Sequence, residues 1–182
     1  MSVQIGAKPL ADFDRPLEML ADCHRRVEHF LDVLIRVEAL YRGKPLDKQA
    51  ILALKAAQLY FQTSAPKHTA DEEESLFPRM RAQLPTGDLA LETLQKLEAD
   101  HLFANQLHWR VERFIDGWCT APALPPAIDR AAQFHNDLQV LKQHYEEHIH
   151  LEEQAVFPQA ARCLSSELIA EIGNEMRQRR HN

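Results

Sequence analysis

The sequence predicts an all-α protein, folded as an up-down-up-down four-helix bundle with a short fifth helix at its C-terminal end. The chain has only five glycines in 182 residues, and its prolines cluster between long segments in which apolar residues recur every three or four positions. Four long helices joined by short loops fold most simply as such a bundle. We expect one domain over residues 1–182, with the bundle at about 15–162.

The first predicted helix runs from about Arg15 to Tyr41, with Asp14 as its N-cap and Pro16 in its first turn. The helix ends at the segment 42–45, which contains Gly43 and Pro45. Its inward face follows steps of three and four residues, as a buried bundle seam should. The predicted seam is Leu17, Leu20, His24, Val27, Leu31, Leu34, Glu38 and Tyr41.

The second predicted helix runs from about Asp47 to Ala82, and we expect bends at Pro66 and Pro78. Its inward face contains one isolated polar residue, Gln58. The other residues of this face are apolar, except for His68 and Glu72, which belong to the repeated motif described below. The predicted seam is Ile51, Leu54, Gln58, Phe61, Ala65, His68 and Glu72.

The third predicted helix spans about Leu89 to Trp118 and the fourth about Ala127 to Arg162, separated by the loop Cys119–Pro126 with three prolines. A fifth helix follows at about 165–180, where Ser165 or Ser166 serves as the cap. The third seam is predicted as Leu91, Leu94, Glu98, His101, Asn105, His108, Glu112 and Ile115. The fourth is Phe134, Leu138, Leu141, Tyr145, His148 and Glu152.

One motif occurs twice, as His68–Pro78 and again eighty positions later as His148–Pro158. Both copies read His-x-x-x-Glu-Glu-x-x-(Leu/Val)-Phe-Pro. Positions i and i+4 share a helix face, so each copy directs one imidazole and one carboxylate to the same side. A single such pair is usually a solvated surface pair. Two copies with the same tail, on inward faces, predict a metal site.

Two further histidines complete the predicted site. At ~1.5 Å rise per residue, His24 and His68 lie roughly 27 and 32 Å from the turn that joins their helices. In the second half, His101 and His148 agree within about one turn, so all four imidazoles fit one layer. Such a layer is unfavourable unless metal, hydrogen bonds or protonation compensates it. The predicted metal ligands are His24, His68, Glu72, His101, His148 and Glu152.

The predicted ligands are imidazole nitrogens and carboxylate oxygens without a thiolate, a set that suits iron or manganese and zinc less exclusively. Six ligands with two carboxylates suit two bridged metals. Each of two irons would hold two histidines and two carboxylate oxygens. An oxo or hydroxo bridge would leave one position open for O2, peroxide or NO.

Several nearby residues have supporting interpretations. His144 is either an extra ligand or a half-exposed neighbour of the site, and Tyr145 is a hydrogen-bonding candidate beside it. Asn105 is expected to be a polar partner on the open side of the site, and His108 a satisfied core histidine. The remaining carboxylates of Asp71–Glu74 are expected to form a solvated face. Four histidines have no assignment: His29, His135, His150 and His181.

These motifs resemble the hemerythrin-like family, also called the HHE cation-binding domain. The resemblance covers about Pro16 to Arg162, and it implies a non-haem di-iron centre with a bridging oxygen. Oxygen-carrying hemerythrins have a second histidine four residues after the third-helix histidine, where this chain has Asn105. The resulting four-His, two-Glu set is similar to di-iron proteins that repair iron-sulfur clusters under nitrosative or oxidative stress. Their short N-terminal cysteine-containing domain is absent here.

Composition limits the other function classes. The formal net charge of -6 disfavours nucleic acid as a partner. No window reaches the ~20 apolar residues of a membrane span, and Met1–Pro16 lacks the apolar core of a signal peptide. Three separated cysteines, Cys23 among them without a ligand role, suit a reducing compartment, so we expect a cytoplasmic protein. The fifth helix also offers a surface for a homodimer.

Three functions compete with a di-iron protein that senses, scavenges or repairs. One is a storage or sensing module whose metal mainly stabilises the bundle. A ferritin-like oxidase is disfavoured because its Glu-x-x-His order is reversed here. A zinc hydrolase is disfavoured because the sequence contains no His-Glu-x-x-His.

Overall fold

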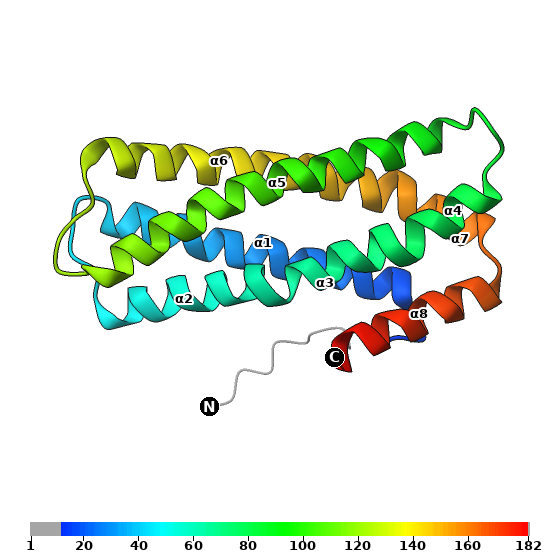
Figure 1. The fold of residues 1–182 in the computed structure, drawn as a ribbon, viewed down its shortest axis with the longest axis horizontal. Coiled ribbons are helices and arrows are strands. Elements are labelled where there is room, and N and C mark those ends of the chain that lie inside the picture. The colour runs from blue at the N-terminus through cyan, green and yellow to red at the C-terminus, as the bar shows by residue number, and fades with distance from the viewer. Residues whose placement is uncertain (1–11, 182) are drawn as a thin grey trace.

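The computed structural model describes residues 12–181, almost all of which lie in helices (Figure 1). The expected lack of a signal-peptide core therefore concerns a segment that lies mostly outside the described residues. No strand occurs between residues 12 and 181. In chain order the elements, with η for a π-helix, are α1 (Pro16–Tyr41), α2 (Lys48–Thr63), α3 (Ala65–Ala70), η1 (Asp71–Leu76), α4 (Phe77–Gln83), α5 (Leu89–Thr120), α6 (Ile128–Leu151), η2 (Glu152–Val156), α7 (Phe157–Cys163) and α8 (Ser166–His181).

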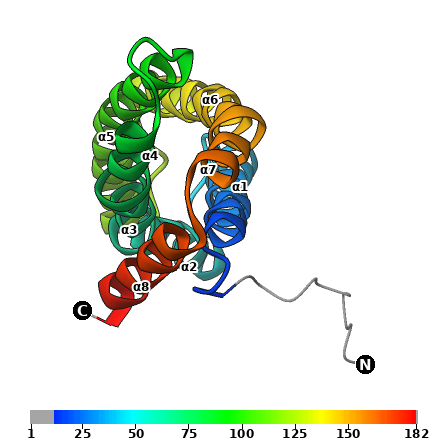
Figure 2. The same cartoon turned by 90° about the vertical axis from the view of Figure 1, so that its right-hand side faces the viewer.

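These elements form four rods that alternate in direction: α1, the series α2 to α4, α5, and the series α6 to α7 (Figure 1). Seen end-on, the rods surround a common axis, and α8 lies outside them (Figure 2). α1 packs on α2 and α6, and α5 packs on the same two helices. The predicted up-down-up-down bundle with a fifth helix is confirmed.

The helix ends agree with the sequence prediction within two residues, but one cap differs. The N-cap of α1 is Arg15, without a side-chain cap bond, so the prediction of Asp14 as cap was wrong. The Asp14 carboxylate instead faces Arg177 of α8, at 3.3 Å. At the start of α8, Ser165 Oγ accepts a hydrogen bond from the Leu168 N–H, as predicted.

The second rod is interrupted at Ser64, between α2 and α3, two residues before Pro66. A second change of helix type precedes Pro78. Proline has no N–H to offer the carbonyl four residues earlier. The Phe77 N–H bonds to the Glu72 carbonyl five residues back, which makes η1 a π-helical turn. The same i to i+5 bond closes η2 before Pro158, so the repeated Phe-Pro tail is associated with a widened turn in both copies.

The hydrophobic core consists of two clusters with a polar layer between them. One cluster reaches the α1–α2 loop through Leu46, and the other reaches the α4–α5 loop through Leu84. On α1, Leu20 belongs to the second cluster and Val27 to the first, with His24 between them. Apolar packing therefore closes the bundle above and below the layer in which the predicted ligands lie.

The third predicted seam was wrong at alternate positions. Glu98 and Glu112 are only half-buried and Asn105 is exposed. The residues that α5 buries instead are the preceding ones, Leu97, Ala104 and Val111. His101 and His108 are buried as predicted. The error arose because a step of three followed by four, and a step of four followed by three, join the same buried residues, so spacing alone did not decide between them.

Helix α8 packs on α1 and η1 and approaches the N-terminal turn closely at Gly173. A Cβ at this position would lie 1.9 Å from the Phe13 carbonyl oxygen, which no real contact allows. A glycine is therefore required for α8 to dock. Within the described residues, no helix is both long and apolar enough to cross a membrane.

The same glycine-to-alanine change should have opposite effects at two positions. We expect Gly173→Ala to lower the free energy of unfolding by at least ~1 kcal/mol, because the added methyl group pushes α8 from Phe13. Gly117→Ala, in α5, meets nothing closer than Arg130 Nη2 at 4.0 Å. It should raise stability by roughly 0.5–1 kcal/mol through helix propensity. Urea unfolding of metal-free protein measures both, and equal effects would contradict the close contact.

Candidate metal centre

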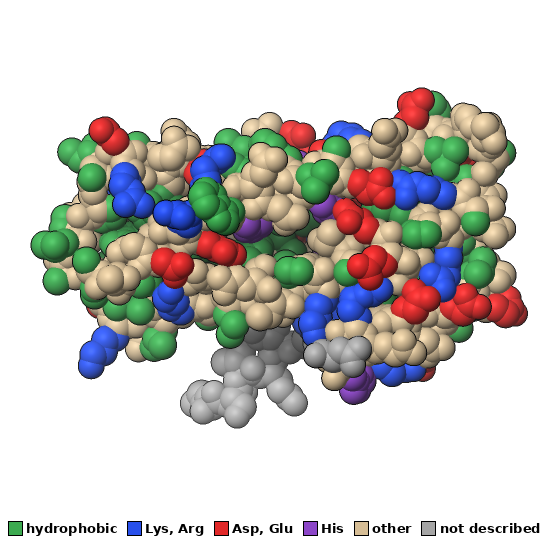
Figure 3. Space-filling model, viewed as in Figure 1, with side chains coloured by type: hydrophobic (Ala, Val, Ile, Leu, Met, Phe, Trp, Pro, Cys, Tyr) green, Lys and Arg blue, Asp and Glu red, His purple; other side chains and the backbone are tan. Residues whose placement is uncertain are grey.

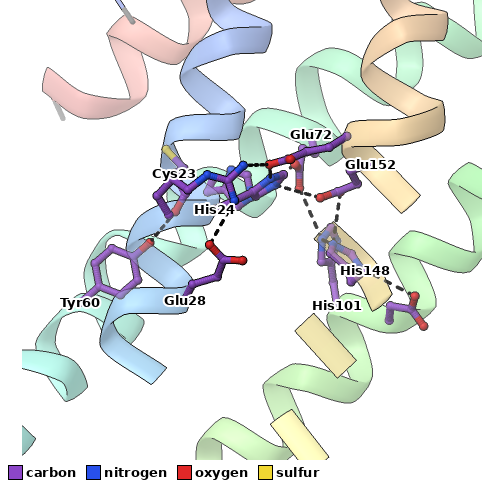
Figure 4. A network of polar contacts seen from close by, with 12 residues as sticks. Cys23, His24, Glu28, Tyr60, Glu72, His101, His148 and Glu152 are labelled. Atoms are coloured by element: carbon purple, nitrogen blue, oxygen red, sulfur yellow. Dashed lines mark hydrogen bonds and ion pairs between the residues drawn. The ribbon is translucent and has the colours of Figure 1, made fainter. Parts of the chain in front are cut away.

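Four imidazoles and two carboxylates meet in one layer of the bundle, and every rod contributes to it (Figure 4). Both glutamate side chains are fully buried, and the histidines are nearly so. The structure thus brings together all of the residues that the sequence predicted as metal ligands: His24 from α1, His68 from α3, Glu72 from η1, His101 from α5, His148 from α6 and Glu152 from η2.

These side chains form two overlapping sets of four. Within each set the potential ligand atoms all lie within 4.8 Å of one another, close enough for one cation to contact them. The two sets share both carboxylates, and each adds the two histidines of one helical hairpin. The sets are His24, His68, Glu72 and Glu152, and His101, His148, Glu72 and Glu152.

Each shared carboxylate lies between histidines of the two halves. The Glu152 oxygens lie 3.0 Å from His24 Nε2 and 3.2 Å from His148 Nε2. Glu72 makes the equivalent contacts, with one histidine of each half, at 3.3 and 3.4 Å. A carboxylate in this position has one oxygen available to each set, which is the arrangement that a bridging ligand requires.

The second glutamate of each motif supports a histidine from a neighbouring rod. Glu153 Oε1 lies 2.9 Å from His24 Nδ1, and Glu73 Oε1 lies 2.8 Å from His101 Nδ1. A neutral imidazole that donates its Nδ1–H to a carboxylate keeps the Nε2 lone pair free. Glu73 and Glu153 therefore favour the tautomer that has its proton on Nδ1. In this tautomer the unprotonated Nε2 faces the centre of the layer.

The expectation of a solvated face for Asp71–Glu74 was wrong in two places. Glu73 has the supporting role just described, and Asp71 is fully buried. The Asp71 carboxylate accepts hydrogen bonds from Arg179 and Arg180 in the last turn of α8, the second at 2.5 Å. The Glu-Glu doublet, identical in both copies, was the sequence signal for the outer glutamates, whereas nothing local pointed to the arginines.

Helix α8 contacts only the first of the two motif copies in this way. Arg179 bonds to three polar side chains of η1, namely Asp71, Glu74 and Ser75. At the corresponding positions the second copy has Leu151, Gln154 and Ala155. The η2 segment instead borders an open surface groove of about 1130 Å³ between α1, α7 and α8, with Glu153 in its wall. The differences between the copies thus follow the docking of α8.

Burial and mutual contact set the protonation of the layer. Burial raises the pKa of Glu72 well above its ordinary range, and the neighbouring Glu152 carboxylate raises it further. Burial acts in the same direction on Glu152, but contacts with His148 and His24 outweigh it and lower the pKa of Glu152. Burial, with His24 beside it, holds the pKa of His68 well below its usual value. Without a cation, the layer therefore keeps Glu72 protonated and Glu152 charged.

Several buried polar atoms of the layer have no hydrogen-bond partner, and a cation would engage most of them. Among the described residues, the orphaned buried atoms concentrate here, although such groups are normally paired. The contacts of 3.0–3.4 Å between carboxylates and ring nitrogens lack hydrogen-bond geometry. The orphaned atoms that a metal would engage are both oxygens of Glu72 and of Glu152, and His24 Nε2. His68 and His148 face the glutamates with Nε2, and their orphaned Nδ1 atoms lie on the other side of the ring.

A small cavity of about 20 Å³ adjoins the layer, and all four layer histidines line it. Its remaining wall includes Ala104, Tyr145 and Ile149, with the exposed Asn105 at the rim. This volume admits about one water-sized molecule. In the space-filling view, histidine side chains appear in a hollow between α5 and α3 (Figure 3). A ligand that reaches the layer must therefore be very small.

The other histidines near the layer have supporting or unrelated positions. His144 Nε2–H donates to the Asp100 carbonyl oxygen, 2.9 Å away, and the residue belongs to neither set, as its half-exposed interpretation predicted. His108 is a core histidine, as predicted, but it is only partly satisfied: its Nε2 bonds to the Tyr145 hydroxyl, and its buried Nδ1 has no hydrogen-bond partner among the described residues. His150 is exposed on the opposite side of α6 from His148.

Comparisons with known proteins agree with this geometry. A family model described as the hemerythrin HHE cation binding domain matches residues 15–160, a range that includes the whole layer. The chain is also similar to an uncharacterized protein of Haemophilus influenzae, with 30% identity over 172 residues. That match covers 93% of this chain and 92% of the relative.

The protonation of Glu72 leads to a test on the metal-free protein. A carboxyl group whose pKa is raised by folding stabilises the fold only while it is protonated, so that contribution is lost as the pH rises above the ordinary value of 4.5. Glu72→Gln removes this loss. We expect its stability advantage over the wild type to grow by up to ~1.4 kcal/mol per pH unit above about pH 5. Thermal unfolding from pH 5 to 8 measures it.

The matched control is Glu147→Gln, since Glu147 is exposed on α6. Its advantage should stay near zero at every pH. A pH-independent effect of Glu72→Gln would contradict the assignment of the buried proton.

Proposed function

This chain belongs to the hemerythrin HHE cation-binding family, and from that premise we propose that its polar layer binds two iron ions and offers them to O2, NO or peroxide. The observation that carries the proposal is the pair of four-residue sets that share Glu72 and Glu152. Two sets with common carboxylates suit two ions better than one, because each ion then has two imidazoles and one oxygen from each bridge.

The donor types favour iron over other ions. Each set contains two imidazole nitrogens and two carboxylate oxygens, and neither contains a cysteine of the described chain. Thiolate-free sets of this kind suit iron and manganese, whereas structural zinc usually has four closed ligands. Iron is therefore the first choice, and manganese or zinc the second.

When bound, the iron ions would supply the redox chemistry and an open coordination position. The protein supplies the rest. Glu73 and Glu153 fix the tautomers of His101 and His24, and the two apolar clusters keep bulk water from the layer. The cavity of about 20 Å³ limits the ligand to the size of a diatomic molecule or peroxide.

Asn105 favours reaction over reversible oxygen storage. It occupies the position at which oxygen-carrying hemerythrins have an additional histidine, and it stands at the cavity rim. Its amide can hydrogen-bond a small molecule but is a poor iron ligand. We therefore propose a role in sensing, scavenging or iron-sulfur repair under oxidative or nitrosative stress. The cytoplasm suits this role, since all three cysteines are free.

A storage or sensing module without turnover is the alternative. Its support is the complete burial of both carboxylates, because a sealed site gives a metal a large share in the stability of the bundle. In that case metal removal would lower the melting temperature, while NO or peroxide would leave the absorption spectrum unchanged.

Metal analysis of untagged protein, loaded anaerobically with Fe(II), tests the proposal. We expect about two irons per chain, with near-ultraviolet charge-transfer absorption after oxidation and a spectral change on addition of NO or peroxide. His148→Ala should reduce the iron content sharply. His150→Ala is the matched control, because this exposed histidine lies two residues away on the same helix. Zinc alone, or no metal in iron-replete preparations, would overturn the di-iron assignment.

A further inference from the structure

Tyr145 separates two spaces in the molecule. Its ring is part of the wall of the small cavity at the metal layer, together with the four layer histidines. It also lines a surface pocket of about 180 Å³ between α1 and α6. Tyr145 lies one turn before His148, and the two ring centroids are 6.5 Å apart. A single aromatic ring thus connects the buried layer with the surface.

The Tyr145 hydroxyl has one defined partner. It lies 2.8 Å from His108 Nε2, and His108 is itself buried against the Phe61 ring, with centroids 4.4 Å apart. Burial lowers the pKa of His108 to about 4, so its imidazole is neutral and accepts at neutral pH. Burial raises the pKa of Tyr145, which keeps the phenol protonated and donating. The bond therefore runs from the phenol to the imidazole.

Neither residue has a task in the metal layer as described. Neither belongs to the two sets of potential ligands. A phenol is the most readily oxidised side chain in this wall, and its loss of an electron makes the hydroxyl strongly acidic. A base already hydrogen-bonded to that hydroxyl can take the proton without any movement of the chain.

We propose that Tyr145 is a redox-active residue that supplies an electron to the metal layer, with His108 as its proton acceptor. The inference rests on the proposed function, and its oxidant is hydrogen peroxide at the loaded centre. Peroxide takes two electrons and two solvent protons to give two waters. The iron, when bound, would supply one of these electrons, and Tyr145 supplies the other. The Tyr145 O–H bond breaks, its proton moves to His108 Nε2, and a neutral phenoxyl radical remains.

The surface pocket identifies the class of reductant that completes the cycle. Its polar wall has three carboxylates and one ammonium group, from Glu28, Asp32, Glu146 and Lys142. This excess of negative charge favours a neutral donor, such as a hydroquinone, over an anionic one. A hydroquinone has two electrons to give. One reduces the phenoxyl radical while the proton on His108 returns to the Tyr145 oxygen, and the other would restore the iron. The donor leaves as a quinone, and its two protons replace those that peroxide consumed.

The chain offers a matched control for this residue. Tyr60 is buried and Tyr145 half-buried, and burial raises the pKa of both, but the Tyr60 hydroxyl faces the Cys23 carbonyl at 3.4 Å. A carbonyl cannot accept a proton in this way. The third tyrosine of the chain, Tyr41, bonds to Asp47 at the surface, at 2.5 Å. Only Tyr145 combines a buried base with a wall of the metal cavity.

Electron paramagnetic resonance tests the proposal. Iron-loaded protein of measured iron content is mixed with hydrogen peroxide and frozen within seconds. We expect an organic radical with tyrosyl hyperfine structure in the wild type and in Tyr60→Phe, and no such signal in Tyr145→Phe. Circular dichroism and iron analysis show whether each variant is folded and loaded. His108→Gln keeps Tyr145 and should slow radical formation about 100-fold, the low end of what a positioned base contributes.

Each outcome decides the question. A radical that survives in Tyr145→Phe, or none in fully iron-loaded wild type, overturns the inference and leaves the iron assignment standing. Failure of the wild type to take up iron overturns both. Unchanged radical kinetics in His108→Gln would refute the proton acceptor, even if Tyr145 is the radical site. Added hydroquinone should shorten the lifetime of the radical in the wild type. If the lifetime does not change, the surface pocket is not the donor site.

Discussion

The fold depends on one electrostatic constraint, which is the burial of two carboxylates and four imidazoles in a single layer. Isolated charges in such surroundings are strongly disfavoured, so the chain must either protonate them, pair them or supply a cation. The structure shows the partial solution that the protein alone can reach, in which Glu72 is held protonated and Glu152 is held charged by its histidines. Apolar clusters on both sides keep bulk water from the layer, which adjoins only a cavity of about 20 Å³. A positive charge at the centre of the bundle would therefore stabilise the fold.

The backbone geometry serves the same constraint. Both carboxylates lie at the start of a π-helical turn, and each of these turns ends directly before a Phe-Pro pair. Each turn carries two adjacent glutamates, and the two have different roles. At each turn the first glutamate enters the layer and the second, Glu73 or Glu153, reaches an imidazole of a neighbouring rod. The duplicated motif thus encodes both the ligand and the group that orients a ligand from elsewhere in the chain. Neither half can form a complete set alone, since each carboxylate contacts histidines of both halves.

Local and periodic features were predictable from the sequence. The bundle, the helix ends and the convergence of the six polar residues followed from repeating patterns and residue counts. The π-helical turns were not predicted because a proline indicates only that an α-helical hydrogen bond is missing, and not which bond replaces it. The α5 seam was wrong at Glu98, Asn105 and Glu112 because it was drawn from spacing alone, and the apolar character of the preceding residues would have corrected it. The pairing of Asp71 with Arg179 and Arg180 joins residues more than a hundred positions apart, and no period or motif carries that information.

The one-sided docking of α8 makes the two halves of the centre mechanically unequal. On the η1 side, a buried carboxylate and two arginines fasten the backbone next to Glu72. On the η2 side, the segment that carries Glu152 borders an open groove, and its arginine contact, from Arg25 to Glu153 at 2.6 Å, lies at the surface rather than at a buried carboxylate. Local opening draws on the least fastened segments of a structure. Backbone amides of η2 and α7 should therefore exchange with solvent hydrogen sooner than those of η1 and α4. Metal ions would then enter and leave the buried centre mainly on the η2 side.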